Sequence, residues 1–509
     1  MTLKPATTTE ARSMEASVGP AKVEGGRGRW LAVGVLMIAS FMDLMDVTIV
    51  NVALPAMQAD LGASSAQVQW VVAAYLLPFS VLLITSGRLG DIAGRRRMFL
   101  IGVAAFTALS LVAGLAPSAD VLVVARALQG AAAALMIPQV LSIIQAMFAP
   151  RERAAVFGLY GAVTGLAAVV GPMLGGWLVT ADLWGTGWRS IFLINLPVGV
   201  LLLVATTRWV RESRSPNPLR LDLPGVVLSA GAVFLVVFPL VQGRELEWPS
   251  WIIAMLVASV PAFAIFALFE RQLERRGGSP VVPMSLFTKR GFSSGVLVTT
   301  AFNAGVGGFF LVLALYVQGA LGFTAWEAGL VLVPFSVGAM VASGVAVPLA
   351  ARAGRLVILA GGALIAGAML LAREEATEAG TALGTFGLLV PMVLAGLGLG
   401  LVVVPLVDVT LAGVGVRDAG AASGVLNTTR QLGQAFGVAM VGVVFFGVLD
   451  DGPATVALAQ RAFADSVWLA VALFGLSFVA SFLLPPRAVD PEAVEAGPTN
   501  APVLARRPG

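Results

Sequence analysis

The sequence predicts an all-α polytopic membrane protein in which fourteen helices cross the bilayer. Of its 509 residues, 58% are hydrophobic and 12% are charged, whereas a soluble protein carries about 25% charged residues. Apolar runs of about 20 residues recur along the chain, each long enough to cross a hydrocarbon core of about 30 Å. Most of the 32 basic residues lie in alternate short loops, which indicates membrane topology rather than nucleic-acid binding.

The lengths of the apolar runs place the spans. They cover residues 30–55, 67–87, 97–116, 120–147, 153–180, 188–208, 222–242, 250–270, 294–320, 326–350, 355–372, 382–410, 418–448 and 464–485. Because basic loops mark the cytoplasmic side and the number of spans is even, both termini are predicted to be cytoplasmic. The polar stretches 1–29 and 486–509 are interpreted as cytoplasmic tails. The first apolar run is too long for a cleaved signal peptide.

A weak internal repeat divides the spans into two sets of six. The loop Gly87–Arg97 joins spans two and three, and Leu349–Arg355, a shorter copy, joins spans ten and eleven. We expect two six-span bundles, 30–208 and 292–485, separated by residues 209–291 with two extra spans. Paired halves with a site between them are a recurring plan of secondary transporters.

The absence of two residue types narrows the chemistry. The sequence has no Cys and no His, which excludes disulfides, thiolate or imidazole metal sites and imidazole proton relays. Residues Gly291–Gly295 spell G-x-S-x-G, but without a His such an elbow has no base. No lysine lies in a phosphate-binding loop. We therefore expect no enzyme activity, no cofactor and no metal, and any transport must draw on an ion gradient through carboxylates.

Two carboxylates, Asp43 and Asp46, lie inside the first span, at the centre of Phe41–Pro55. They are three residues apart and share one face of a helix. An acid within a span costs roughly 2.5–3.5 kcal/mol on insertion scales and normally faces a cavity or a partner. We therefore predict that these two acids handle protons and cargo.

Two arginines inside spans are the predicted partners of these acids. Counted at about 1.5 Å per residue, Asp46 lies roughly 8 Å from the outer edge and Arg126 about 8–9 Å from it, so the two can pair. Arg430 falls near the midplane. A neighbouring guanidinium lowers a carboxyl pKa and burial raises it, so movement of the arginine would change proton affinity. The alternative is a static ion pair that fixes helix packing.

Two glycine-rich stretches are candidates for moving parts. The first is a cytoplasmic gate in the loop after span two, where glycines permit tight turns and Asp91 can accept bonds from a helix N-terminus; ordinary positive-inside chemistry is the alternative. Its residues are Gly87, Arg88, Gly90, Asp91, Gly94, Arg95 and Arg96. The second, in span five, predicts a hinge or close packing. Its residues are Gly165, Gly171, Pro172, Gly175 and Gly176.

Other residues have weaker assignments. Asp408 and Glu327 fall near span ends, where an acid can reach water. An adaptable apolar pocket is one interpretation of a further set, although lipid contact or the core is favoured for each member taken alone. The set is Met42, Met45, Phe302, Phe309, Phe310 and Tyr316.

The loop GRLGDIAGRRR resembles the signature loop of the major facilitator superfamily. The matching residues are Gly87, Leu89, Asp91, Gly94, Arg95 and Arg96. Four further stretches resemble the fourteen-span drug:proton antiporters of that superfamily. They are Asp46–Pro55, Arg126–Gly130, Gly171–Gly176 and Trp188–Pro197. Two positions depart from the family: Ile92 replaces a usual basic residue, and Asp43 lies outside the pattern.

The resemblance implies two bundles that export a molecule in exchange for protons. The expected function is thus a proton-coupled antiporter that exports amphipathic, cationic or neutral, small molecules. Its expected partners are protons, a lipophilic cargo and the bilayer, and we expect a monomer in a bacterial cytoplasmic membrane. One alternative is a dedicated exporter of one metabolite, such as a self-made antibiotic or a lipid. The other is a non-transporting receptor or scaffold.

Overall fold

The computed structural model describes residues 26–148, 150–215, 218–412, 414, 419–453 and 455–486. Within them, fourteen helical segments are long and apolar enough to span a membrane. The predicted fold class, an all-α bundle with fourteen spans, is therefore confirmed. Most of each predicted tail lies outside the described residues.

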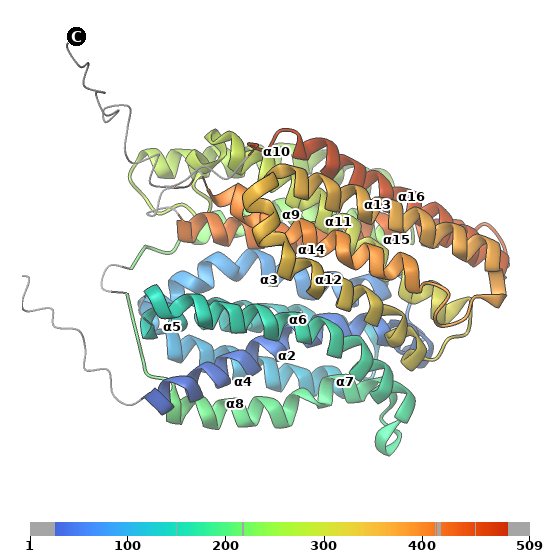
Figure 1. Cartoon of the computed structure of the whole chain (residues 1–509), viewed down its shortest axis with the longest axis horizontal. Helices are drawn as coiled ribbons and strands as arrows, with labels where there is room; N and C mark the ends of the chain where they lie inside the picture. Colours follow the sequence, from blue (N-terminus) through green and yellow to red (C-terminus); the bar gives the residue numbers. More distant parts are fainter. Residues whose placement is uncertain are drawn as a thin grey trace, which may run out of the picture.

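The first six spans lie together on one side of the molecule, coloured blue to green in Figure 1. The sixth is made of two helices that follow a short turn. The six spans are α2 (Gly26–Leu61), α3 (Ser65–Ala93), α4 (Arg95–Gly114), α5 (Ala119–Met147), α6 (Pro150–Ala181) and the pair α7 (Ser190–Leu193) and α8 (Asn195–Trp209). We call them the first half.

The last six spans form the other side of the molecule (Figure 1), and two further helices lie between the two sets in the sequence. The intervening helices are α9 (Leu223–Gln242) and α10 (Ser250–Arg275). The second half comprises α11 (Arg290–Gly319), α12 (Ala325–Ala353), α13 (Arg355–Ala379), α14 (Leu389–Leu411), α15 (Ala419–Leu449) and α16 (Val456–Ser481).

Equivalent helices of the two halves begin in the same way. Helix α3 starts with a capping box in which Ser64 accepts from the Gln67 amide and Gln67 accepts from the Ser64 amide. Helix α12 repeats this with Thr324 and Glu327. Each box satisfies two backbone amides that the first helical turn leaves without partners. This shared start agrees with the repeat seen in the sequence.

Three predicted boundaries were wrong by about two helical turns, among them the start of the last span, which was predicted at residue 464 and lies at Val456. The helix predicted at 355–372 runs to Ala379, because its charged end still has good helix formers. The helix predicted at 382–410 begins only at Leu389. The intervening residues form a short 3-10 turn that starts at Gly380, where φ is +53°. Glycine adopts such angles without steric cost.

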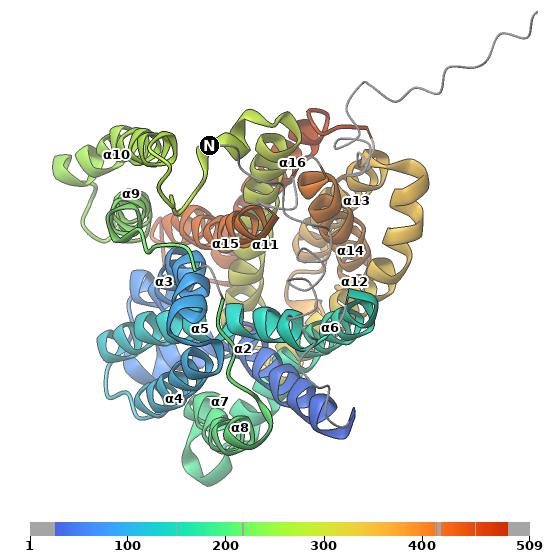
Figure 2. The ribbon, with the colours of Figure 1, turned by 90° about the vertical axis from the view of Figure 1, so that its left-hand side faces the viewer.

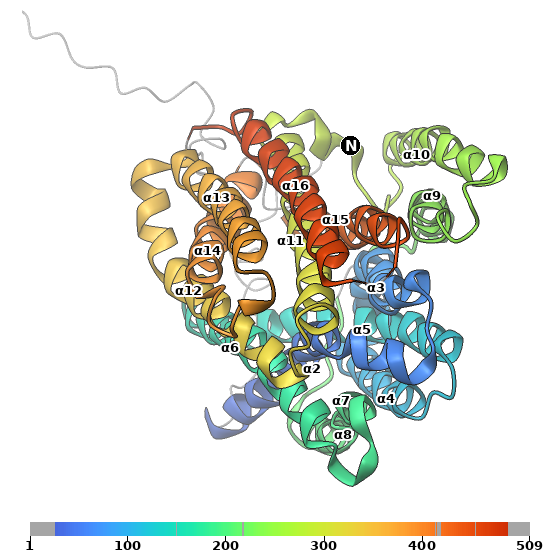
Figure 3. The ribbon, with the colours of Figure 1, turned by 90° about the vertical axis from the view of Figure 1, so that its right-hand side faces the viewer.

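The two intervening helices lie beside the seam of the halves. Figures 2 and 3, which view the molecule from its two ends, both show α9 against α3 and α15, with α10 outermost. Val233, Val237 and Val241 of α9 pack in one apolar cluster with Ala73 and Ala439. Helix α9 therefore contacts both halves where they meet.

Hydrogen bonds join the two halves at one side of the bundle and also between α3 and α15, where Thr428 donates to the Ser80 carbonyl at 3.0 Å. We call the side with the Arg95–Arg97 loop the basic side and the other the opposite side. At the opposite side, Gln318 of α11 donates to the Val52 carbonyl at 2.9 Å. There too, the Trp326 amide of α12 donates to Thr180 Oγ1 of α6 at 3.2 Å. Contacts described between these helix pairs close the opposite side.

Candidate functional site

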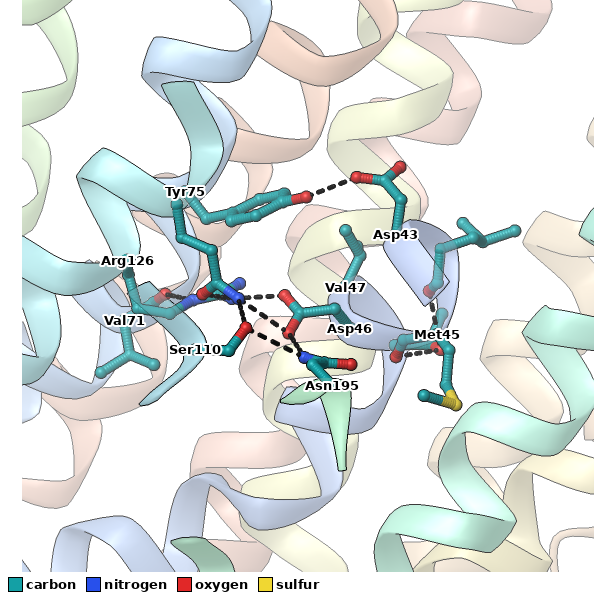
Figure 4. Close-up of polar contacts among 12 residues, drawn as sticks. Asp43, Met45, Asp46, Val47, Val71, Tyr75, Ser110, Arg126 and Asn195 are labelled. Carbon is teal, nitrogen blue, oxygen red and sulfur yellow. Dashed lines mark hydrogen bonds and ion pairs between the residues drawn. The ribbon is translucent and has the colours of Figure 1, made fainter. Parts of the chain in front are cut away.

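A buried ion pair joins two helices of the first half, as predicted. Arg126 of α5 donates to Asp46 of α2, with 2.5 Å between Nη1 and Oδ2. Their side chains are 2% and 0% exposed. Figure 4 shows the two charges facing each other at the centre of a polar cluster. The sequence estimate of matching depth is thus borne out by the geometry.

The guanidinium of Arg126 is held from several directions. Its Nε donates to the Val71 carbonyl at 3.2 Å, and its Nη1 donates to Gln129 Oε1 at 2.8 Å. The guanidinium carbon lies 4.2 Å from the centre of the Tyr75 ring and 5.8 Å from that of Phe192. Aromatic faces attract cations. The arginine therefore keeps favourable contacts on its flanks besides the carboxylate.

Three neutral residues complete the cluster. The sequence analysis gave none of them a role, although Gln129 and Asn195 lie in stretches that resemble the family. Gln129 and Asn195 each donate to Asp46 Oδ1, at 3.2 and 3.0 Å. Both also donate to the Ser110 hydroxyl, at 2.9 and 3.3 Å. A carboxylate that accepts several bonds while paired with a guanidinium can remain charged in a buried site. Ser110 and Asn195 bring α4 and α8 into the same network, as Figure 4 shows.

Asp43 lies outside this network and has a different partner. Its Oδ1 accepts from the Tyr75 hydroxyl at 2.7 Å, and its residue is 9% exposed. Tyr75 thus links the two acids: its hydroxyl binds Asp43, and its ring packs on Arg126, the partner of Asp46 (Figure 4). The two acids, which the sequence assigned to one function, occupy different environments.

Arg430 comes from the second half and does not join the buried pair. Its side chain, on α15, is exposed. Electrostatic interactions link its guanidinium to Tyr160 of α6 and to Asp43 of α2. Because both partners belong to the first half, Arg430 faces the space between the halves rather than lipid.

The signature loop binds the segments that flank the two intervening helices. Arg88, 8% exposed, donates to the carbonyls of Arg220 and Ser279 at 3.2 and 2.7 Å, and to that of Pro280. Gly94, with φ of +114°, forms the sharp turn between α3 and α4. In the described residues, Arg88 therefore anchors the linkers of α9 and α10.

Two buried acids bind backbone amides of the segment whose Ser279 and Pro280 carbonyls accept from Arg88. Asp222 accepts from the Val281 amide at 3.2 Å, and Glu270 accepts from the Val282 amide at 3.0 Å. Both acids interact electrostatically with Arg88. Sequence reasoning missed this cluster, because the two acids lie far apart in the chain: Asp222 caps the start of α9, and Glu270 lies on α10.

The predicted helix-capping role of Asp91 was wrong. Its carboxylate binds the side chain of Arg95, one turn later, at 2.8 Å. Glu212 from the linker caps α4 instead, accepting from the amides of Arg96 and Arg97 at 3.0 and 3.1 Å. The positive end of a helix dipole favours such a carboxylate.

The glycines of span five allow close contact with two neighbours. A Cβ at Gly171 or Gly175 would collide with Thr48 or Ile49 of α2, and one at Gly176 would collide with the Ala325 carbonyl of α12. Pro172 takes part in the same contact, since its carbonyl lies against Gly329. At Gly165, by contrast, a Cβ would meet no atom within 4 Å. Close packing therefore explains the glycines from 171 to 176.

Several weaker assignments are now resolved. Glu327 caps α12, as described above, whereas Asp408 is exposed on α14. Of the two interpretations of the apolar set, the core is confirmed for all members but one, because these members are buried. Those buried are Met42, Met45, Phe302, Phe309 and Tyr316. The exception, Phe310, is partly buried and packs edge-to-face on Phe335, with ring centres 4.9 Å apart.

Comparison with known families decides the identity of the fold. The family model described as Major Facilitator Superfamily matches residues 36–438. The chain belongs to the major facilitator superfamily. Members of this superfamily are transporters, not enzymes, and this member is a multi-pass membrane protein with fourteen candidate spans in its described residues.

Several curated relatives within the superfamily are named as transporters, export proteins or resistance proteins. The chain is 44% identical to a probable actinorhodin transporter of Streptomyces coelicolor, over 83% of this chain and 73% of the relative. It is 36% identical to the multidrug resistance protein Stp of Mycobacterium tuberculosis, over 79% and 73%. A solved bacterial homologue of the human lysosomal transporter Spinster, inward-facing and unoccupied, has the same fold. That comparison has a TM-score of 0.64 at 16% identity and covers 90% and 98% of the two chains. These relatives support a drug exporter of the superfamily.

Proposed function

We propose that this superfamily member is a proton-coupled antiporter that exports amphipathic small molecules, cationic or neutral, by alternating access. The observation that supports this most directly is the ion pair of Asp46 and Arg126, sealed inside one half. A membrane-buried acid is costly, so it is normally retained for ion or substrate transfer. Asp46 would accept the proton, and Arg126 would stabilise its charged form between cycles.

The contacts of Asp46 suggest how protonation would act on the helices. Once protonated, Asp46 would attract Arg126 only weakly, and Gln129 and Asn195 would lose the charge to which they donate. These residues lie on α5 and α8, so the energetic link among α2, α5 and α8 would weaken. A change in proton occupancy would thus bias two packings of the first half.

The contacts between the halves fit one state of such a cycle. The opposite side is closed by contacts of α2 with α11 and of α6 with α12. We place the basic side in the cytoplasm, because basic loops mark that side. This state would then receive cargo from the cytoplasm. We further propose a monomer in the bacterial cytoplasmic membrane with both termini in the cytoplasm.

A dedicated exporter of one metabolite is the second candidate. The relative with 44% identity is named for a single antibiotic, whereas Stp is named for multidrug resistance. The receptor or scaffold alternative is disfavoured, because the named relatives are exporters and resistance proteins.

One experiment separates the two candidates. Membrane vesicles turned inside out would be given an acidic lumen, and uptake of a panel of lipophilic cations, neutral drugs and acidic dyes would be followed. The antiporter proposal expects uptake of several compounds that stops when the pH gradient is collapsed. Uptake of one compound alone would favour the dedicated exporter. Uptake that persists without any ion gradient would refute proton coupling.

A further inference from the structure

The charges of the central region differ in how accessible they are. Asp46 is fully buried and already binds Arg126, Gln129 and Asn195. Arg126 is itself 2% exposed. Neither charge of this pair can therefore contact a molecule that enters between the halves in this state.

Asp43 offers little more to such a molecule. Its residue is 9% exposed, and its Oδ1 is occupied by the Tyr75 hydroxyl. Two acids inside a span would suit a cationic cargo only if both carboxylates were open to it. One is buried and neutralised, and the other is mostly covered.

Arg430 is the accessible charge. Its side chain is exposed although residues of both halves surround it, and Asp43 and Tyr160 lie within electrostatic range. No hydrogen bond or ion pair is described between its guanidinium and the residues that the structure covers. An arginine with these properties retains its donors for a ligand.

Polar residues continue along the same face of α15. Ser423, Asn427 and Gln434 are seven and three residues before Arg430 and four after it, which is the spacing of one helix face. Ser423 is exposed, and the other two are partly exposed. In an apolar span, a stripe of this kind is expected to face a ligand path rather than lipid.

We propose that Arg430 recognises the cargo, and that the cargo is an aromatic molecule carrying an anionic oxygen acceptor, a phenolate or a carboxylate. The planar guanidinium presents several donors to oxygen acceptors and also stacks on aromatic rings. A lipophilic cation would be repelled by the guanidinium. This inference rests on the proposed proton-coupled export, but it replaces the cationic or neutral cargo proposed there with an anionic one. Proton binding remains with Asp46, so recognition and coupling use different charges.

The test compares two dyes that share one three-ring core. Fluorescein has phenolate and carboxylate oxygens, whereas rhodamine 123 has amino groups, an ester and a positive charge. Inside-out vesicles containing the full chain and an acidic lumen should accumulate fluorescein faster than rhodamine 123. The variant Arg430→Gln should lower fluorescein uptake about tenfold or more, the scale of one charge-assisted bond. Arg430→Lys should retain part of the uptake, because it keeps the charge but not the planar donors.

Arg461→Gln is the matched control. Arg461 lies near the start of α16, its side chain is 70% exposed, and its ion pair with Asp465 is long, at 3.8 Å. Such an exposed pair contributes little, so this variant should transport like the wild type. Thermal unfolding in detergent checks that all variants fold. Rhodamine 123 uptake that exceeds fluorescein uptake, or wild-type fluorescein uptake by a folded Arg430→Gln variant, would overturn the inference. Rhodamine 123 uptake driven by the gradient would leave the proposed function intact. Loss of gradient dependence for both dyes would overturn both proposals.

Discussion

Replacement of Asp46 by Asn separates a coupling role of the buried pair from a structural one. The substitution keeps the size of the side chain but leaves the guanidinium of Arg126, 2% exposed, without its counter-charge. Removing one partner of a buried pair costs about 3–5 kcal/mol of stability. Contacts of Arg126 with Val71, Gln129 and the Tyr75 ring remain, so we expect the lower end, about 3 kcal/mol. Proton-driven transport should be lost.

The double variant Asp46→Asn with Arg126→Gln makes this prediction sharper. It removes both charges, so no uncompensated ion stays buried. Replacement of a whole buried pair by neutral residues is often neutral or even stabilising. We therefore expect the double variant to recover most of the stability that the single variant loses, yet to remain inactive.

Two measurements decide the outcome. Stability is followed by unfolding in mixed detergent and dodecyl sulfate micelles. Activity is followed by uptake into inside-out vesicles of a cargo that the wild type transports, with and without a pH gradient. A double variant that is stable and still shows gradient-driven uptake would refute the role of Asp46 in coupling and would support a static pair. A single variant as stable as the wild type would refute the argument from the buried charge.

Two further predictions use matched pairs of positions. Tyr75→Phe removes the hydroxyl that donates to Asp43. This variant should change the pH dependence of transport and lower stability by about 1 kcal/mol. The control Tyr316→Phe removes a buried hydroxyl of the second half and should leave the pH dependence of transport unchanged. Gly176→Ala should push α6 from α12 at the closed side and favour the alternative state, whereas Gly165→Ala should not, because its Cβ meets no atom within 4 Å. Since the chain has no Cys, labelling of single introduced cysteines on each side measures this shift without background, and equal labelling of the two glycine variants would contradict it.

The sequence predicted those features that depend on position along a helix. Hydropathy and loop charge were sufficient for the fourteen spans, because each run must cross the same hydrocarbon thickness. The rise per residue was sufficient to match the depth of Asp46 with that of Arg126. The capping role of Glu327 was also visible in principle, since Thr324-x-x-Glu327 is a capping-box pattern.

Features that depend on the rotation and crossing of helices were not predictable. Gln129, Ser110 and Asn195 are neutral residues on three helices, and only their packing brings them to one carboxylate. The separate environments of Asp43 and Asp46 arise in the same way. Residues three apart share a broad helix face, yet they differ by about 60° around the axis (three residues at about 100° each). That difference turns one acid toward Arg126 and the other toward Tyr75.

The division of roles between Asp46 and Arg430 has an electrical consequence. If one proton enters the cell for each singly charged anion that leaves, two positive charges move inward per cycle. A singly charged cation exchanged for one proton would move none. A membrane potential contributes about 2.3 kcal/mol per charge per 100 mV. At 100 mV it would therefore drive export of an anionic cargo by about 4.6 kcal/mol per cycle and would not drive export of a cation.

Fluorescein methyl ester, a monoanion, tests this consequence directly. In inside-out vesicles without a pH gradient, a potassium diffusion potential that makes the lumen positive should drive its uptake by the wild type. The Arg430→Gln vesicles report any passive leak. Uptake that ignores the potential would mean that the cargo crosses with its charge compensated. Recognition by Arg430 and proton transfer by Asp46 would then not be independent steps, and the protonation of Asp43 beside the cargo would have to be included in the cycle.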